Sequence, residues 1–182
     1  LQHPVTSEYG SGFKQIKETL NAVHKISKAG MQIVWLWPNI DAGSDSISKG
    51  IRMFREKKDA KNMHFYINFT PEDYVVLLAN ACCIVGNSSS GLREGAFLGV
   101  PCVNIGTRQS GREQAKNVIN VKYNAFDIKT AIEHQLKHGK YTSSHLVGDG
   151  TSGKKIVKIL ASTKLKTQKQ LSYVSKDSGV SK

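Results

Sequence analysis

Short apolar runs alternate with amphipathic stretches along most of this 182-residue chain, and this alternation constrains the fold more than any other feature. The runs that predict strands are residues 32–37, 64–67, 82–85, 102–105 and 118–121. Helices are predicted at residues 11–29, up to Lys57, from Pro71 with Thr70 as N-cap, and at 91–98, 127–137 (capped by Asp127) and 153–161. Such alternation is typical of one parallel sheet covered by helices on both faces. We therefore predict an α/β, doubly wound, Rossmann-like fold.

Domain organisation is predicted to be simple. Residues 1–162 are expected to form one domain, and residues 163–182 a basic, poorly ordered tail, because the hydrophobic pattern fades after Ser162. The chain starts at Leu1 without a Met, on a stretch (residues 1–6) that looks like the end of a truncated strand. We interpret the sequence as a fragment of a longer polypeptide. No apolar run approaches the roughly 20 residues that span a bilayer, so no membrane association is expected.

The formal net charge of +12 permits binding to nucleic acid, anionic lipid or a phosphorylated small molecule. Much of the excess lies in the last 29 residues, whose eight lysines have a single aromatic residue, Tyr173, among them, so nucleic acid is not the expected partner. Cys82, Cys83 and Cys102 form no CxxC pair and are predicted to be small buried residues in strands, which fits a reducing cytoplasm. Neither a metal nor a cofactor is indicated.

The strongest local signal is the segment Gly86–Glu94, which follows a predicted strand and enters a helix. Small residues, serine hydroxyls and the free N–H groups of a helix start suit a phosphate cradle, although the segment is neither a P-loop nor GxGxxG. A serine-rich helix cap is the equally open alternative. Glu94 suits the two hydroxyls of a ribose, or is simply an acid favoured at a helix start.

Other loops that follow predicted strands carry further polar candidates. Arg108 and Arg112 lie in a glycine-bounded loop and suit phosphate or carboxylate recognition. Asn39 suits a base or a sugar, or belongs to an ordinary turn. His3 suits an acid, a base or a phosphate donor. Ligands bind at the carboxyl ends of the strands in such sheets, so the loops that follow strands are the candidates for a ligand site.

Read together, these loops and their neighbours follow an order that is typical of one enzyme family. The motifs are His3–Thr6, Pro38–Ser44, Gly86–Ser89, Arg93–Glu94, Gly106–Gln109 with Gly111–Glu113, and Gly148–Gly150. Over about residues 1–160 the chain resembles the C-terminal half of UDP-N-acetylglucosamine 2-epimerases. His3-Pro4-Val5-Thr6 is closest to the hydrolysing branch of sialic-acid biosynthesis, since the other branch carries a His-Arg-Arg-Glu-like string there.

The resemblance implies a two-domain fold of the GT-B type, with an N-terminal domain that is absent here and UDP held mainly by the present half. It assigns the phosphates to Ser88 and Ser89, the ribose to Glu94 and uracil to Phe69. Asn39 and Arg108 would line the nucleotide pocket, and His3 would approach the diphosphate and the sugar. His3 and Arg108 are the implied catalytic residues of this half.

The implied reaction removes UDP from UDP-N-acetylglucosamine, gives 2-acetamidoglucal, and adds water to yield N-acetylmannosamine and UDP. The acid and base carboxylates belong to the absent domain, so the fragment is expected to be inactive alone, and the full-length enzyme to be a cytoplasmic homo-oligomer. Two alternatives stay open. One is the nucleotide-binding half of a GT-B glycosyltransferase, and the other is a basic, non-catalytic nucleic-acid-binding module.

Overall fold

The computed structural model describes residues 1–57, 60–164 and 168. The chain divides into two compact units, Leu1–Val147 and Gly148–Lys182. The second unit contains helix α7 (Ser152–Ser162), which corresponds to the last predicted helix. Most of the tail that was predicted to be poorly ordered lies outside the described residues.

All described strand pairs are parallel, as predicted, and they form two groups. The strands are β1 (Ile33–Leu36), β2 (Met63–Tyr66), β3 (Ile84–Gly86), β4 (Cys102–Ile105) and β5 (Val118–Val121). β1 pairs with β2, and Ile33 lies opposite Met63. The second group has the order β3-β4-β5, with Cys102 opposite both Ile84 and Val118. The α/β class with a parallel sheet is confirmed, although hydrogen bonding does not join the two groups into one continuous ladder.

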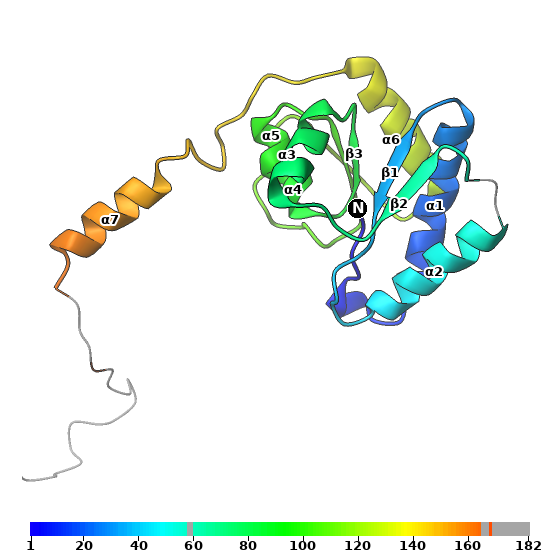
Figure 1. Cartoon of the computed structure of the whole chain (residues 1–182), viewed down its shortest axis with the longest axis horizontal. Coiled ribbons are helices and arrows are strands. Elements are labelled where there is room, and N and C mark those ends of the chain that lie inside the picture. The colour runs from blue at the N-terminus through cyan, green and yellow to red at the C-terminus, as the bar shows by residue number, and fades with distance from the viewer. Residues whose placement is uncertain (58–59, 165–167, 169–182) are drawn as a thin grey trace, which may run out of the picture. The chain divides into compact units, whose positions relative to one another are not determined.

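The first residues of the chain run beside β3. The Leu1 ammonium donates to the Val85 carbonyl at 2.9 Å, and the Asn87 N–H donates to the Leu1 carbonyl at 3.2 Å. This is the bonding pattern of a parallel ladder, in which one residue bonds to the two neighbours of its partner. Figure 1 shows the N-terminus between β3 and β1. The short 3-10 turn η1 (Thr6–Glu8) then leads the chain away.

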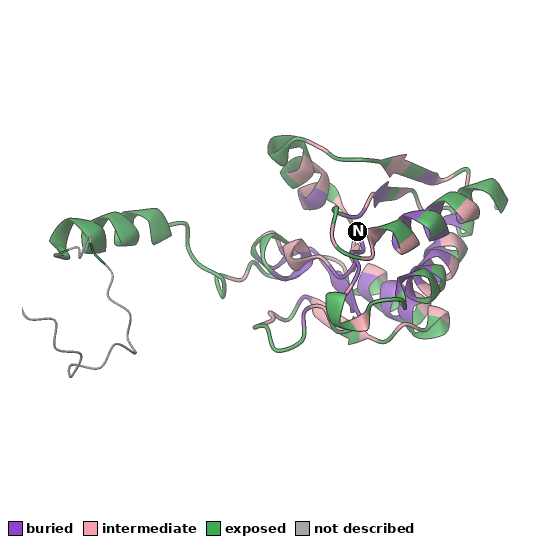
Figure 2. Cartoon of the chain, turned by 90° about the horizontal axis from the view of Figure 1, so that it is seen from below, coloured by how far each residue is buried: buried purple, intermediate pink, exposed green. Residues whose placement is uncertain are grey.

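Helices cover the strands on two sides. α1 (Gly12–Lys28), α2 (Ser44–Lys57) and α6 (Ala125–His138) gather on one side, whereas α3 (Pro71–Asn80), α4 (Ser89–Leu92) and α5 (Glu94–Phe97) gather near β3 on the other (Figure 1). The apolar residues of α1 recur every three or four positions, which places them on the face that packs inward. Ile16, with no exposed surface, joins Val103 and Ile128 in the main core, and Figure 2 shows buried residues concentrated inside the first unit.

One helix cap was predicted correctly and one was not. The Thr70 hydroxyl accepts from the Asp73 N–H at 3.2 Å, as predicted. The prediction that Asp127 caps the next helix is wrong, because α6 begins at Ala125 and the Asn124 side chain accepts from the N–H groups of Phe126 and Asp127. Asp and Asn are comparable N-cap residues, so the sequence alone did not separate the two positions.

Replacing Asn124 with alanine should therefore lower the free energy of unfolding by about 1 kcal/mol, because two N–H groups of α6 lose their acceptor. Asp127→Ala removes only a first-turn charge and should cost about 0.5 kcal/mol. Urea denaturation of both variants checks the order. A larger loss for Asp127→Ala would return the capping role to the aspartate.

The cysteine prediction holds only for Cys102, which is buried in β4. Cys82 is exposed and Cys83 is partly buried, and both precede β3, which begins at Ile84. Burial raises the pKa of the Cys83 thiol to about 12 and that of Cys102 further still, so neither thiol is reactive at neutral pH.

Candidate functional site

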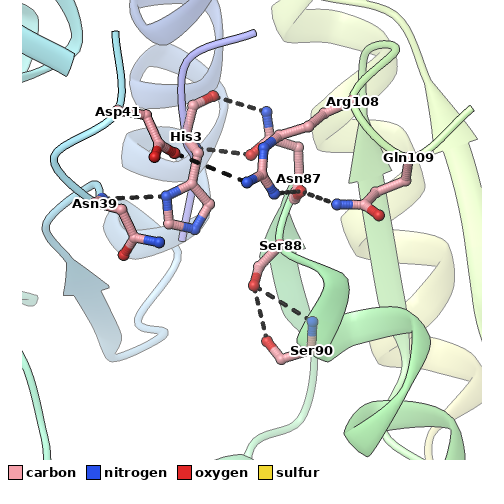
Figure 3. A network of polar contacts seen from close by, with 8 residues as sticks. All are labelled: His3, Asn39, Asp41, Asn87, Ser88, Ser90, Arg108 and Gln109. Carbon is pink, nitrogen blue, oxygen red and sulfur yellow. Dashed lines mark hydrogen bonds and ion pairs between the residues drawn. The ribbon is translucent and has the colours of Figure 1, made fainter. Parts of the chain in front are cut away.

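The loops after the strands converge at one edge of the first unit. His3 follows the segment that runs beside β3, Asn39 follows β1, Asn87 follows β3, and Arg108 follows β4. Figure 3 shows these side chains pointing toward one another across the edge. Because parallel strands end at the same side of a sheet, residues far apart in sequence meet there.

Asn87 lies at the centre of this network and is completely buried. Its side-chain oxygen accepts from the His3 N–H at 2.7 Å, and its side-chain nitrogen donates to the His3 carbonyl at 2.8 Å. Its main-chain carbonyl accepts from Arg108 Nη1 at 3.2 Å and from Gln109 Nε2 at 2.7 Å. One residue thus contacts both predicted catalytic residues, His3 and Arg108.

His3 is only 4% exposed, and the hydrogen bonding of its imidazole indicates the tautomer. The Asn39 N–H donates to His3 Nδ1 at 3.2 Å, so Nδ1 is an acceptor and the proton of the neutral ring lies on Nε2. Burial, then the Arg108 guanidinium and the chain ammonium, lower the His3 pKa to about 4, partly opposed by the Asp41 carboxylate. At neutral pH His3 is therefore an uncharged N–H donor.

The Arg108 guanidinium supplies the positive charge of the site. Its Nη2 lies 3.9 Å from the Asp41 carboxylate, and both side chains are partly exposed. An ion pair this long and this accessible contributes little to stability. The guanidinium is thus held in place by its hydrogen bond to the Asn87 carbonyl, and its remaining N–H groups can bind an anion.

A cluster of hydroxyls adjoins this network at the start of α4. The Ser88 side chain caps the helix by accepting from the Ser90 N–H at 3.3 Å, and the two serine hydroxyls lie 3.0 Å apart. The Tyr74 hydroxyl from α3 lies 2.6 Å from that of Ser90. Ser89 is the first residue of α4 and is partly buried. The serine-rich segment therefore does cap a helix, and its hydroxyls also face the same edge as Asn87 (Figure 3).

Glu94 and Phe69 lie apart from the central network. The helix predicted at residues 91–98 is two short helices, α4 and α5, separated at Arg93, and the exposed Glu94 begins α5. Phe69 is partly buried, and its ring packs on Tyr66 with centroids 4.9 Å apart. Among the described residues, no hydrogen bond or ion pair joins either side chain to His3, Asn87 or Arg108. Their predicted roles on ribose and uracil stay predictions.

Two hollows differ in their chemistry. The smaller, about 380 Å³, is lined by residues 4–7 together with Asp41, Thr107 and Arg108, at the edge where the loops converge. The larger, about 580 Å³, lies between β1 and β3 and has a mostly apolar lining. A polar ligand at the carboxyl ends of the strands needs charged groups and N–H donors, and the lining of the smaller hollow includes charged groups. Of the predicted site residues, Arg108 lines this hollow, and we place the candidate site between the hollow and the serine cluster beside Asn87.

Three residues of this polar network were not predicted from the sequence to have a function. Asn87 stood within a motif, Asp41 within a loop, and Gln109 beside the arginine, but none was assigned a function. Burial is what distinguishes Asn87 and Gln109, both of which have no exposed surface. The signal in the sequence was their position in loops that follow strands, where buried amides satisfy loop backbone groups.

The described residues contain no group of three or more His, Cys, Asp or Glu side chains placed to hold a metal ion. Nor does the described part of the chain include a helix with the length and apolar character needed to cross a membrane. The site itself offers the uncharged N–H of His3, the Arg108 guanidinium and the serine hydroxyls. Groups of these kinds bind phosphate oxygens and stabilise developing negative charge.

Residues 1–161 match the family model described as UDP-N-acetylglucosamine 2-epimerase. The chain is 32% identical over 151 residues to the Neisseria meningitidis protein named UDP-N-acetylglucosamine 2-epimerase, covering 81% of this chain and 37% of that protein. It is 32% identical over 171 residues to the Legionella pneumophila UDP-N,N'-diacetylbacillosamine 2-epimerase (hydrolyzing), covering 92% and 43%. The chain thus spans about two fifths of the length of these relatives.

The fold also matches the Methanocaldococcus jannaschii UDP-GlcNAc 2-epimerase, whose structure was solved in complex with UDP-GlcNAc and UDP. The TM-score is 0.68 and the sequence identity 22%, and the match covers 88% of this chain and 44% of that one. At this identity the likeness establishes the fold.

Proposed function

Because this chain belongs to the UDP-N-acetylglucosamine 2-epimerase family, we propose that it is the UDP-binding, C-terminal half of such an enzyme. The observation that carries the proposal is the set of hydrogen bonds by which Asn87 holds both His3 and Arg108. An N–H donor and a guanidinium at the carboxyl ends of parallel strands suit a diphosphate.

In this proposal the diphosphate of UDP lies against His3 Nε2–H and Arg108. Ser88 and Ser89 add donors to the phosphates, Asn39 lines the pocket, Glu94 holds the ribose hydroxyls and Phe69 contacts uracil. The assignment to phosphates is supported by the hydroxyl cluster beside Asn87, and the assignment of Glu94 by its exposed place at the start of α5. A neutral His3 binds an anion as a donor without an obligatory proton transfer.

The proposed reaction is hydrolysing 2-epimerisation. A proton leaves C2 of the sugar while the C1–oxygen bond breaks, so UDP departs and 2-acetamidoglucal remains. Water then adds across the double bond to give N-acetylmannosamine. His3 and Arg108 stabilise the charge that develops on the departing diphosphate, and the acid and base come from the other half of the full-length enzyme. Support for the hydrolysing course is the His3–Thr6 motif and the name of the Legionella relative.

We further propose that the full-length enzyme is a homo-oligomer that works in the cytoplasm. The three cysteines support the second point, since all are free thiols and none is paired in a disulfide.

Calorimetric titration of the chain with UDP tests the proposed binding site. Arg108→Ala and Glu94→Ala should each weaken UDP binding by about tenfold or more, because each removes a charged or charge-assisted contact. Uridine separates the two roles. Arg108→Ala should weaken UDP much more than uridine, because the arginine contacts phosphate, whereas Glu94→Ala should weaken both ligands alike.

Matched controls are available nearby. Arg112 is an exposed arginine on the same loop, and Glu72 is an exposed first-turn acid on α3, so their alanine variants should bind UDP as the wild type does. Equal losses of UDP affinity in Arg108→Ala and Arg112→Ala would mean that the loss comes from the change in net charge and not from a specific contact. No UDP binding by the folded chain, together with salt-sensitive binding to DNA, would sink the proposal in favour of a nucleic-acid-binding module.

A further inference from the structure

The side chain of Asn87 forms hydrogen bonds with the main chain of His3 in the way that a neighbouring strand would. Main-chain bonds join the first residue of the chain to β3, through Leu1 N–H to Val85 and Asn87 N–H to Leu1. Where β3 ends, at Gly86, the Asn87 side-chain amide continues this ladder with a two-way pair to the His3 main chain. A primary amide offers an acceptor and a donor side by side, as a peptide group does. Asn87 therefore takes the place of one further strand residue.

The same residue fixes the other side of the site with its main chain. Its carbonyl oxygen accepts from Arg108 and from the buried Gln109, both on the loop after β4. Because Asn87 is completely buried and its carbonyl oxygen accepts two hydrogen bonds, this oxygen has a defined position. It therefore also fixes the positions of the two side chains that donate to it. Figure 3 shows His3 and Gln109 on opposite sides of Asn87, and the Arg108 guanidinium pointing toward Asp41.

We propose that Asn87 is the positioning residue of the site, which sets the His3 ring against the Asn39 N–H and sets the Arg108 guanidinium beside it. It acts on a ligand only through these two residues. Its effect on UDP affinity rests on the proposed function, whereas its effect on the His3 ring does not.

The position of Asn87 needs both an acceptor for the His3 N–H and a donor for the His3 carbonyl, and aspartate and alanine do not supply both. Aspartate keeps the acceptor for the His3 N–H but lacks the donor for the His3 carbonyl, so two oxygens would face each other. Alanine lacks both groups and leaves the N–H and carbonyl of His3 without partners in a buried place. In either case the His3 backbone is freed, and its ring is no longer constrained to accept from Asn39.

Nitrogen-detected NMR of the ligand-free chain measures the His3 tautomer and pKa, with the His3→Gln variant used to assign the signals. The wild type should show a single tautomer with the proton on Nε2 and a pKa well below the ordinary value, as its burial and neighbours dictate. In Asn87→Ala the two tautomers should mix and the pKa should return toward its ordinary value. UDP affinity should fall about tenfold.

Asn104→Ala is the matched control. Asn104 is also a buried asparagine, it lies in β4 opposite Gly86, and its side chain bonds to Asn120 rather than to the site. It should leave the His3 tautomer and pKa unchanged, because a general loss of packing does not act on one ring. Should Asn87→Ala fail to fold, the isosteric Asn87→Asp replaces it, judged by the tautomer because its added charge shifts the pKa directly.

A folded Asn87 variant whose His3 keeps the wild-type tautomer overturns the proposal. So does a loss of UDP affinity no greater than that of Asn104→Ala. If the wild type fails to bind UDP, the proposed function fails, but the tautomer measurement still decides whether Asn87 positions His3.

Discussion

Replacing Gly86 with alanine is expected to lower the free energy of unfolding by about 3 kcal/mol, among the largest losses from any single methyl group added to this chain. Gly86 has φ +136°, a conformation that residues with a side chain rarely adopt. A Cβ built there would lie 1.8 Å from the Leu1 carbonyl oxygen and 2.6 Å from its carbon. Both atoms are main chain, and they belong to the segment that carries His3, so relief requires moving that segment away from β3.

Gly30→Ala separates backbone strain from collision. Gly30 also has a positive φ, +98°, but a Cβ there meets nothing within 4 Å. Its loss should be about 1 kcal/mol, the cost of the left-handed conformation alone. Urea denaturation of both variants at neutral pH gives the comparison. Losses of similar size would mean that the contact between Gly86 and Leu1 is not what makes this glycine necessary.

Most of the fold could be predicted from the sequence, because in most elements the hydrophobic pattern and the residues that start or end the element indicate the same structure. The strands at residues 102–105 and 118–121 were predicted at their observed bounds, and the helix at 11–29 within one residue at each end. Such segments combine a clear period with a clear stop, as Gly30 provides after α1. One error falls where two residues of similar chemistry compete, as Asn124 and Asp127 do for the cap of α6.

The site was only partly accessible. The carboxyl-end rule singled out the loops of His3, Asn39 and Arg108, the family resemblance assigned them to one pocket, and in the structure these residues lie together. What the pattern did not reveal is how they are held together. An asparagine such as Asn87 looks the same in a solvent-exposed turn as in a buried network, because the difference lies in burial and in partners 84 residues away in sequence. Contacts between distant segments leave no local period to detect.

Lowering the pH from 6.5 to 4 is expected to remove about 2 to 3 kcal/mol of stability through His3 alone. The folded-state pKa is about 4, whereas an unfolded histidine titrates near 6.5. Above that range neither state binds the proton, so His3 adds no pH dependence. Between the two values the unfolded state takes up a proton and the folded state does not, so the free energy of unfolding falls as the pH falls, by about 1.4 kcal/mol per unit.

The difference between wild type and His3→Gln isolates this term, because carboxylates that titrate near pH 4 contribute to both proteins and cancel. Urea denaturation at intervals from pH 7 to pH 4 should show the wild type losing stability faster than the variant. His134→Gln, at an exposed histidine on α6, controls for the removal of one imidazole from the chain. Parallel slopes for wild type and His3→Gln would mean that His3 takes up a proton normally in the folded chain. The ring would then meet UDP as a cation at mildly acidic pH, and the donor role assigned to its neutral form would have to be abandoned.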